Sequence, residues 1–511
     1  MTQPAAISSG VRLSHLLAGF AEVNTVLDPE ITSLTLDSRK VSNGGLFLAC
    51  SGGRHHGLEF LSQALEQGAA AVLWEPDSNW TVDSLASLTI PDSVVMLPVC
   101  GLGKRVSMIA GRFFRHPDLE LLLIGITGTN GKSSCTQYLA RVLAPDLRCG
   151  TIGTLGIGFP DALMESNHTT PDPVTLQAAL ADFRDAGADA VAMEVSSHAL
   201  DQERVAALNF DVAVFTNLSR DHLDYHASFS AYGEAKRRLF RMAGLKVWVI
   251  NLDDAFGQAL VSDAPVGVTI IGYGQGADRS FCDRVSRYIW ASEVHSDDSG
   301  MRIDLESSWG NGSISTRLLG RFNVSNLLAV SAVLLQQGIS LAQAVERLAG
   351  LATVPGRMER FGGGDQPLVI VDYAHTPDAL QQVLSASRGH ARGHLLCVFG
   401  CGGDRDSGKR PEMAAIAETL ADQVFVTDDN PRTEDGNRIV ADILSGMREP
   451  GRARVERDRA TAIRLAITSA TAGDVVLVAG KGHENYQQVG GVRLPFDDRE
   501  QVRRVLLEAT Q

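Results

Sequence analysis

The sequence lacks the features of secreted, membrane-spanning and broadly basic proteins. Its seven cysteines form no CxxC pair and no disulfide-like framework, which is typical of free thiols in a reducing compartment. No apolar run is long enough to span a bilayer, and the segment MTQPAAISSG lacks the basic and apolar regions of a signal peptide. The net charge of −14 argues against a generally basic nucleic-acid-binding surface but allows a local basic site. We therefore expect a cytoplasmic protein without nucleic-acid binding or membrane insertion.

The chain is long enough for about three domains. With 44% hydrophobic and 21% charged residues in 511, each domain can bury a core. Strand-like and helix-like segments alternate from residue 11 to about 98, which indicates a small α/β domain. A central block follows, and a second series of buried strands begins near Leu351. We expect domains at residues 1–99, 100–349 and 350–511.

The segment LLLIGITGTNGKSS, residues 121–134, is the strongest single motif. It reads as a buried strand that breaks at Gly128 and Gly131 and delivers Lys132 and Ser133 to the start of a helix. Glycines let backbone N–H groups converge on an anion, while the lysine neutralises phosphate charge and the hydroxyl can reach Mg²⁺. Ile126 stands where a strict GxxxxGK[ST] motif would have glycine, so an ordinary strand–turn–helix without a ligand remains the alternative.

Further polar groups follow the strands of the central block. Glu194 ends the strand ADAVAMEV, a position where Mg²⁺ or an attacking group is usually handled. The strand DVAVFTNL ends in SRDHLDYH, whose spacing favours a magnesium–nucleotide site or a polar loop over a zinc site. Residues 272–316 alternate in polarity and predict an antiparallel patch appended to the parallel sheet. Asn323 and Asn326 begin an apolar helix, where they can cap it or pair with a nucleobase edge.

In the first block, Asp37-Ser38-Arg39 and residues 52–57 can bind a polar ligand or serve as a turn and a connector. In the third block, four strands end in polar or glycine-rich loops, and parallel strands bring such loops to one edge of a sheet. That edge would carry Asp372, His375, Arg405, Asp429, Asn430, Arg432, Lys481, His483 and Glu484.

The predicted edge offers both charge signs, which suits an amino acid. Arg405 and Arg432 can each bind a carboxylate with two hydrogen bonds, and Asp429 and Glu484 can bind ammonium groups. Joining an amine to a carboxylate with ATP requires conversion of the carboxylate to an acyl phosphate. Catalysis of that reaction consists mostly of positioning and charge neutralisation.

An ordered set of motifs resembles the Mur ligase family. The set is TGTNGKS, HTTPD, EVSSHAL, TNLSRDHLDYH, FNVSN, VPGRMER, VDYAHTPDAL, FGCGGDRDSGKRP, DDNPR and GKGHE. The match extends from Leu36 to Glu484. Within the family, the motifs most resemble those of the ligases that add meso-2,6-diaminopimelate to UDP-N-acetylmuramoyl-L-alanyl-D-glutamate. This resemblance implies a monomeric, cytoplasmic enzyme of peptidoglycan precursor synthesis. It also implies an α/β fold with an N-terminal UDP-binding domain, a central P-loop ATPase-like sheet and a C-terminal Rossmann-like domain.

The resemblance also implies roles for individual residues. ATP would be bound by Gly128, Thr129, Asn130, Gly131, Lys132, Ser133, Ser134, Asn323, Asn326, Arg357 and Asp372. Catalysis would involve Lys132, Glu194, His222 and Lys236, with Mg²⁺ held by Ser133, Glu194, His222 and Lys236, the last as a carbamate (N6-carboxylysine). The UDP-linked substrate would contact Leu36, Ser38, Gly53, Arg54, His55, Thr169, Thr170, Ser196, Gln202 and Arg204. Diaminopimelate would contact Arg405, Asp429, Asn430, Pro431, Arg432, Gly480 and Glu484.

Two positions depart from the family pattern, namely His168, where relatives often have asparagine, and the Arg54-His55-His56 loop. The DNPR segment is associated with diaminopimelate, and lysine-adding relatives lack its arginine. The physical reason agrees, because diaminopimelate has a second carboxylate to pair with Arg432. A folylpolyglutamate synthase-like ligase is the main rival, but it is not expected to carry DNPR or the N-terminal block. A non-catalytic nucleotide-binding switch would need neither the third-domain edge nor Glu194 together with His222.

Overall fold

The computed structural model describes residues 10–24, 26–53, 55–85, 88–166, 168–276, 278–297 and 300–508. The chain forms two compact units. The first unit contains Met1–Thr127, Leu143–Ala213 and Ala235–Lys246, and the second contains Gly128–Val142, Val214–Glu234 and Val247–Gln511. Three of the five boundaries between these segments lie inside an element: α5 (Lys132–Leu143), β12 (Val212–Phe215) or α8 (Phe229–Phe240).

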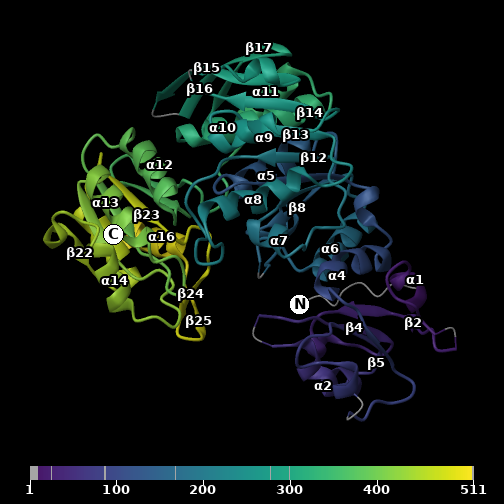
Figure 1. The fold of residues 1–511 in the computed structure, drawn as a ribbon. Helices are drawn as coiled ribbons and strands as arrows, with labels where there is room; N and C mark the ends of the chain where they lie inside the picture. Colours follow the sequence, from purple (N-terminus) through teal and green to yellow (C-terminus); the bar gives the residue numbers. More distant parts are fainter. Residues whose placement is uncertain are drawn as a thin grey trace. The chain divides into compact units, whose positions relative to one another are not determined.

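The N-terminal part of the first unit is built on a parallel sheet (Figure 1). Its strands lie in the order β3 (Ser33–Thr35), β4 (Gly45–Ala49), β5 (Ala69–Trp74) and β6 (Val95–Pro98). Alternate residues of β4 face opposite sides, because side chains of a strand have a period of two. Leu46 and Leu48 share a core with α1 (Leu13–Leu17) and α4 (Leu102–Phe113), and Phe47 shares another with α2 (Leu61–Glu66).

Small elements complete this part of the chain. They are β1 (Val11–Arg12), which pairs with β2 (Glu30–Ile31), together with α3 (Val82–Leu85) and the 3₁₀ helices η1 (Ser38–Lys40), η2 (Gly57–Phe60) and η3 (Pro117–Leu119).

The first unit also contains five strands that follow the N-terminal part. Their order is β10 (Ala162–Met164), β9 (Gly156–Phe159), β8 (Cys149–Gly153), β11 (Ala190–Glu194) and β7 (Leu122–Thr127). β8, β11 and β7 are parallel, whereas β9 and β10 fold back antiparallel. The sequence analysis did not anticipate this turn back. Asp172 is the N-cap of α6 (Pro173–Asp185), and its carboxylate accepts from two backbone N–H groups of the first turn. α7 (Ser197–Asp201) follows β11.

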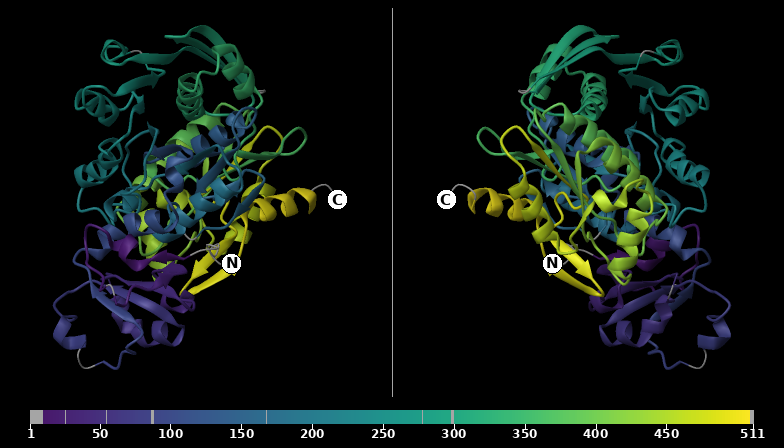
Figure 2. Two further views of the ribbon diagram at one scale, coloured as in Figure 1. Left: turned by 90° about the vertical axis from the view of Figure 1, so that its right-hand side faces the viewer. Right: turned by 90° about the vertical axis from the view of Figure 1, so that its left-hand side faces the viewer.

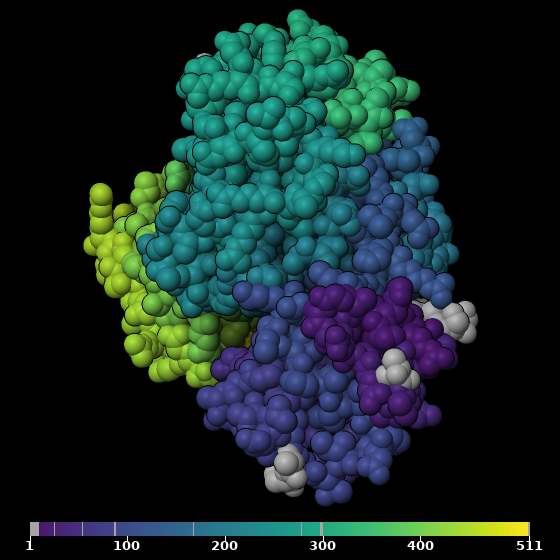
Figure 3. Space-filling model, turned by 45° about the vertical axis from the view of Figure 1, so that its right-hand side comes forward, coloured from purple at the N-terminus to yellow at the C-terminus, as the bar shows by residue number. Residues whose placement is uncertain are grey.

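In the second unit, β13 (Val247–Asn251), β14 (Thr269–Gly274) and β15 (Arg287–Asp297) are parallel. β15 then pairs antiparallel with β16 (Gly300–Ser307), and β16 with β17 (Gly310–Thr316). The predicted antiparallel patch is present, but it begins at β15 and not at residue 272, because β14 continues the parallel series. This part also contains α9 (Ala255–Ser262), η4 (Cys282–Arg284), α10 (Arg321–Gln336) and α11 (Leu341–Ala349). α11 packs on β17, and its green surface adjoins the teal strands in Figure 3.

The C-terminal part has a second sheet with helices on both faces. The strand order is β18 (Glu359–Gly362), β19 (Leu368–Asp372), β23 (Val475–Ala479), β20 (Leu395–Phe399), β21 (Gln423–Val426) and β22 (Arg454–Val455). Only β18 is antiparallel to its neighbour among these strands. One face packs on α12 (Pro377–Arg388), α13 (Lys409–Leu420) and α14 (Gly436–Leu444), and the other on α15 (Arg459–Ser469) and α16 (Asp498–Glu508).

This arrangement confirms the predicted doubly wound fold, and β23 brings its loop between those of β19 and β20. A separate hairpin of β24 (Tyr486–Val489) and β25 (Val492–Pro495) follows β23 and is visible as the pair of yellow strands in Figure 2. The sequence analysis did not predict it. The remaining short element is η5 (Pro450–Arg452).

All seven cysteines are free thiols, as expected. Burial raises the pKa of Cys397 and Cys401 to about 12, so both stay protonated near neutral pH. Within the described ranges, none of the helices is both long and apolar enough to cross a membrane.

Candidate active site

The loop between β7 and α5 has the backbone of an anion-binding turn. Gly128 and Gly131 have φ angles of 149° and 87°, where residues with a side chain are strained. A Cβ atom on Gly131 would lie 2.5 Å from Oδ1 of Asn326. The carbonyl oxygen of Asn130 accepts hydrogen bonds from Thr216 Oγ1 at 2.6 Å and Asn217 Nδ2 at 3.1 Å. The segment after β12 therefore holds the loop in shape.

Two cationic side chains lie at this loop. Lys132 Nζ donates to the carbonyl oxygens of Gly128 and Thr129, both at 2.8 Å. Arg357 Nη2 donates to Ser133 Oγ at 3.1 Å. Together with the N-terminus of α5, these charges fit a phosphate group. ATP binding by Lys132, Ser133 and Arg357 stays a prediction.

The start of α10 does not use asparagine caps. Its N-cap is Gly320, while Asn323 Nδ2 donates to Leu319 O at 2.8 Å and Asn326 Nδ2 to Asn323 Oδ1 at 3.1 Å. The capping alternative is therefore wrong, and the amide of Asn326 instead lies against Gly131 of the loop. The role of both asparagines near adenine stays a prediction.

Sequence reasoning missed Asp378 in the first turn of α12. Its Oδ2 accepts from Asn130 Nδ2 at 2.9 Å and from Ser219 Oγ at 3.4 Å. It therefore connects the C-terminal sheet with the phosphate loop inside the second unit. The signal available in the sequence was an acidic residue directly after Pro377, which stands at the first position of a helix.

Asp372, at the end of β19, is buried beside the segment that carries Arg357 and Met358. Burial raises the pKa of its carboxyl to about 6, although Arg357 and backbone N–H groups counteract the shift. One of these donors is Met358 N, at 2.8 Å from Oδ2. The Arg357 guanidinium also stacks over the Tyr373 ring at 4.5 Å from its centroid.

The TNLSRDHLDYH segment forms a charged group with the C-terminal sheet. Asp221 Oδ2 lies 3.3 Å from Nε2 of His222 and 3.9 Å from Nε2 of His375. Burial opposes ionisation of Asp221, but His222, His375 and Lys409 hold its pKa far below the usual range. Burial and the Lys409 charge lower the pKa of His375 to about 4, so its ring is neutral at pH 7. Sequence reasoning had not singled out Lys409.

In the first unit, Glu194 is the centre of a hydrogen-bonded group. Its side chain is buried and accepts from Thr154 N at 2.8 Å and Thr154 Oγ1 at 3.3 Å. Thr154 Oγ1 lies 3.0 Å from Thr169 Oγ1, and Thr170 Oγ1 donates to the Glu194 carbonyl at 2.8 Å. The two Thr154 donors to the carboxylate are neutral, so an oxygen-binding cation such as Mg²⁺ fits its charge.

The predicted contacts of the UDP-linked substrate in the HTTPD and EVSSHAL segments surround Glu194. Ser196 N donates to Thr170 Oγ1 at 3.1 Å, and Arg204 Nη1 donates to Thr170 O at 2.6 Å. Arg204 also binds Gln202 Oε1 through Nε at 3.0 Å and Nη2 at 2.6 Å. Partial desolvation of the ring, followed by the charge of Arg204, lowers the pKa of His168.

The other predicted contacts of the first unit are more dispersed. Ser38 is buried and donates to Gln63 Oε1 at 2.7 Å, whereas His55 Nδ1 lies 2.9 Å from Glu59 Oε2 at the surface. Leu36 packs against the N-terminal core, Gly53 is exposed, and Arg54 lies outside the described residues. Lys236 is buried, so the solvent-exposed alternative for this lysine is wrong. Its modification stays a prediction.

The C-terminal sheet brings together the predicted ammonium-binding residues. Glu484 Oε2 accepts from Asn430 Nδ2 at 2.9 Å and Lys481 Nζ at 2.8 Å. Lys481 Nζ lies 3.6 Å from Asp429 Oδ1, and a Cβ on Gly480 would lie 3.1 Å from Asp429 Oδ2. This group therefore has the charges needed for an amino group.

The two predicted carboxylate-binding arginines flank Gly402. A Cβ on Gly402 would lie 2.8 Å from Arg432 Nη1 and 3.7 Å from Arg405 Cγ. Arg432, directly after Pro431, has a φ of 55° and donates from Nη1 to Gly403 O at 2.8 Å. Arg405 Nη1 lies 3.6 Å from Asp224 Oδ2, a partner that the sequence analysis did not foresee.

The unpredicted hairpin supports the DNPR segment. Gln487 Nε2 donates to Asp429 O at 2.9 Å, and Gln488 N donates to Asn430 Oδ1 at 2.8 Å. Arg432 N in turn donates to Gln488 O at 3.0 Å. β24 therefore fixes the backbone from which Asp429, Asn430 and Arg432 project.

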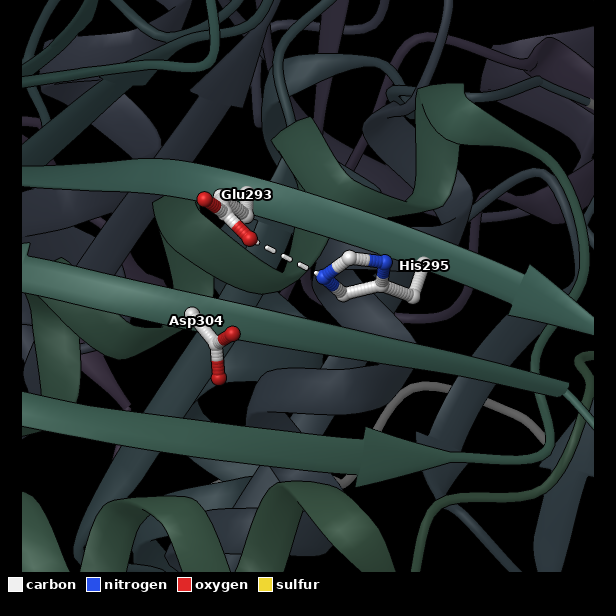
Figure 4. Close-up of side chains that lie close together, drawn as sticks. All are labelled: Glu293, His295 and Asp304. Carbon is white, nitrogen blue, oxygen red and sulfur yellow. Dashed lines mark hydrogen bonds and ion pairs between the residues drawn. The ribbon is translucent and has the colours of Figure 1, made fainter.

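A different group with metal-ligand residue types lies on β15 and β16. The ligand atoms of Glu293, His295 and Asp304 lie within 4.8 Å of one another (Figure 4). Asp304 Oδ1 also accepts from Arg302 Nε at 3.2 Å. Because the arginine already supplies a cation and the side chains are largely exposed, we interpret this group as surface polar contacts.

The fold and these groups define a phosphate-loop protein with a separate amino-acid-type site on a doubly wound sheet. Family models match three parts of the chain: "Mur ligase family, catalytic domain" at residues 30–100, "Mur ligase middle domain" at 126–334 and "Mur ligase, glutamate ligase domain" at 356–482. The chain belongs to the Mur ligase family, which confirms the resemblance seen in the motifs.

Similarity extends over nearly the whole chain. The UDP-N-acetylmuramoyl-L-alanyl-D-glutamate–2,6-diaminopimelate ligase of Ectopseudomonas mendocina is 54% identical over 471 residues, covering 92% of this chain and 93% of that protein. A solved structure of a ligase with the same name has a TM-score of 0.67 and 36% identity, covering 98% and 100% of the two chains. Mycobacterium tuberculosis folylpolyglutamate synthase, with a TM-score of 0.60, 20% identity and coverage of 74% and 92%, shows a shared fold alone.

Proposed function

We propose that the chain is an ATP-dependent ligase that adds meso-2,6-diaminopimelate to UDP-N-acetylmuramoyl-L-alanyl-D-glutamate. The observation that carries this proposal is near-full-length similarity to ligases named for this reaction, 54% over 92% of the chain in one case. The mixed-charge group around Asn430 and Arg432 supports it. The proposal includes a monomer acting in cytoplasmic peptidoglycan precursor synthesis, with domains at residues 1–99, 100–349 and 350–511.

The reaction proceeds through an acyl phosphate. A glutamate carboxylate oxygen of the UDP-linked substrate attacks the γ-phosphorus of ATP, and ADP leaves. The amine of diaminopimelate then attacks the acyl carbon, phosphate leaves, and the amine loses a proton as the amide forms. Both steps move negative charge between oxygens, so positioned cations and N–H groups supply most of the catalysis.

Each part of the site has a role in this scheme. The backbone of the loop at Gly128 and Gly131 binds the ATP phosphates, Lys132 neutralises the transferring group, and Arg357 reaches the same phosphates. By resemblance to the family, Mg²⁺ would be held by Ser133, Glu194, His222 and carbamylated Lys236, and it would offset phosphoryl charge. Glu194 and Ser133 present oxygen atoms that suit this ion.

Selection of the amino acid depends on Arg432. Meso-diaminopimelate places a carboxylate where lysine has none, so the arginine is paired by one substrate and left without a carboxylate by the other. A site of this kind strongly disfavours lysine, because binding lysine removes water from the Arg432 guanidinium without supplying a carboxylate to pair with it. Asp429, Asn430 and Glu484 hold the ammonium groups on the other side.

The test is phosphate release by the purified protein with ATP, Mg²⁺, the UDP-muramoyl dipeptide and a panel of amino acids. We expect turnover with meso-diaminopimelate and very little with L-lysine. In Arg432→Ala, the KM for diaminopimelate should rise by a factor equivalent to about 2–5 kcal/mol, while the KM for ATP stays near its original value. Equal rates with both amino acids in the unmodified protein would refute the proposed specificity.

A further inference from the structure

We propose that Lys481 is a positioning residue for the amino-acid site, because its buried ammonium holds Glu484 and Asn430 in place for the incoming substrate. This inference rests on the proposed function and assigns a role to a residue outside the predicted contacts. Lys481 has a side-chain exposure of 0%, so it is not itself presented to a ligand. Its effect must therefore pass through the groups that it touches.

Lys481, Glu484 and Asn430 form a closed ring of hydrogen bonds. Lys481 Nζ donates to Glu484 Oε2 at 2.8 Å and to Asn430 Oδ1 at 3.1 Å. Asn430 Nδ2 closes the ring by donating to the same Glu484 Oε2 at 2.9 Å. Both donors thus converge on one carboxylate oxygen. Glu484 Oε1 accepts none of these three bonds, and in this proposal it faces an ammonium group of the substrate.

The charges of the group support the same role. Asp429 and Glu484 are acidic, and Lys481 lies 3.6 Å from the first and 2.8 Å from the second. With the lysine, this group carries one net negative charge, which matches one substrate ammonium. Without it, two carboxylates would remain in a largely buried space with no lysine cation between them, and their repulsion would displace at least one of the side chains.

The backbone holds Lys481 where these contacts are made. Gly480 and Gly482 on either side have φ angles of 118° and 53°. Glu484 N donates to Lys481 O at 2.9 Å, so a tight turn brings the glutamate back beside its own lysine. The Tyr486 ring lies 5.4 Å from Nζ and covers the ammonium from another side. The turn is therefore built around a fixed cation.

A double-mutant cycle on Lys481 and Glu484 tests the inference. The variants are Lys481→Met, Lys481→Arg, Glu484→Gln and Lys481→Met/Glu484→Gln, with phosphate release measured against diaminopimelate and, separately, ATP. In Lys481→Met, the KM for diaminopimelate should rise by about 10- to 100-fold, the effect of losing a charged hydrogen bond. The KM for ATP should stay within about twofold, and Lys481→Arg should recover part of the loss.

The cycle separates positioning from direct action. Because Lys481 acts through Glu484, the same lysine substitution should add little in the Glu484→Gln background. A loss confined to kcat, an unchanged KM for diaminopimelate, or full additivity would overturn the inference. If Lys481→Met is too unstable to purify, the double variant is compared with Glu484→Gln, since it no longer contains that buried carboxylate.

Two controls complete the design. Arg388→Met removes a pair with Asp422, 2.8 Å apart, next to the amino-terminal end of β20, and should change neither KM. The unmodified protein is first tested with diaminopimelate. If it does not use that amino acid, the proposed function fails, and the cycle is repeated with whichever amino acid the panel identifies.

Discussion

The buried pair between Arg459 and Asp498 should contribute strongly to the stability of the C-terminal sheet. Arg459 donates from Nε to Asp498 Oδ1 at 2.8 Å, from Nη2 to Oδ2 at 2.7 Å and from Nη2 to Ala479 O at 3.0 Å. Both side chains have an exposure of 0%. Removing one partner leaves a buried charge without compensation, so Arg459→Met should cost about 3–5 kcal/mol.

Hydrogen exchange measured on peptides suits this prediction, because exchange reports the free energy of opening for each region. A loss of 3–5 kcal/mol raises the opening equilibrium by about 100- to 4,000-fold. We expect this increase in peptides from α15, α16 and β23. The double variant Arg459→Met/Asp498→Leu should recover much of the protection, because apolar residues of similar volume replace a buried pair at little cost.

A matched control lies on α16, the helix that carries Asp498. Arg503 on α16 pairs with Glu359 at 3.4 Å, with side-chain exposures of 54% and 21%. Arg503→Met should cost about 0–1 kcal/mol, as exposed pairs do. Unchanged protection in Arg459→Met, or a double variant no better than the single one, would refute the reasoning.

Two further predictions concern the hairpin and the buried Asp372. Gln487→Ala loses the side-chain bond to Asp429 O at 2.9 Å and should raise the KM for diaminopimelate by about 2- to 10-fold. Gln488→Ala should have little effect, since Gln488 contacts Asn430 and Arg432 through its backbone; equal effects in the two variants would contradict the assignment. Burial raises the pKa of Asp372 from 3.8 to about 6. Between pH 4 and 6 the folded state therefore keeps a proton that the unfolded state loses, so the free energy of unfolding of the wild type should fall through that window. Asp372→Asn should remove that fall, gaining about 2–3 kcal/mol on the wild type by pH 7 in urea unfolding, and parallel pH curves would count against it.

Much of the fold was predictable because its strands are buried on both faces. Strands such as LLCVF at residues 395–399 are continuously apolar, and each ends in glycine or polar residues. Such a pattern indicates a parallel sheet covered by helices and places the loops on one edge. The placement of Asp429 and Glu484, the two residues proposed to bind ammonium groups, followed from that edge rule. The same rule placed Asp372 at the end of its strand.

The hairpins were not predictable for the opposite reason. β9 and β10 contain GIGF and ALM, and β24 and β25 contain YQQV and VRLP, which are short and mostly part-exposed or exposed. Weak alternation over four residues does not distinguish a strand from a loop. Burial of single polar residues was also invisible. Lys236 alone reads as a solvent-exposed helical lysine, and the pattern places Lys481 only in a polar loop at the sheet edge. Only the folded chain shows that both side chains are enclosed.

The other features that the sequence did not predict depend on contacts between segments far apart in the chain. The glycines of two facing turns give an example. A Cβ on Gly482 would lie 2.6 Å from Gly356 O and 2.8 Å from Tyr373 N, so the turn that carries Lys481 and Glu484 packs backbone to backbone on the segment that carries Arg357. Arg357 reaches Ser133 of the phosphate loop at 3.1 Å. One close backbone contact therefore fixes a proposed ATP-binding arginine and a proposed amino-acid-binding glutamate together. No residue with a side chain can take the place of Gly482 in this contact, because a Cβ atom there would force the two segments apart.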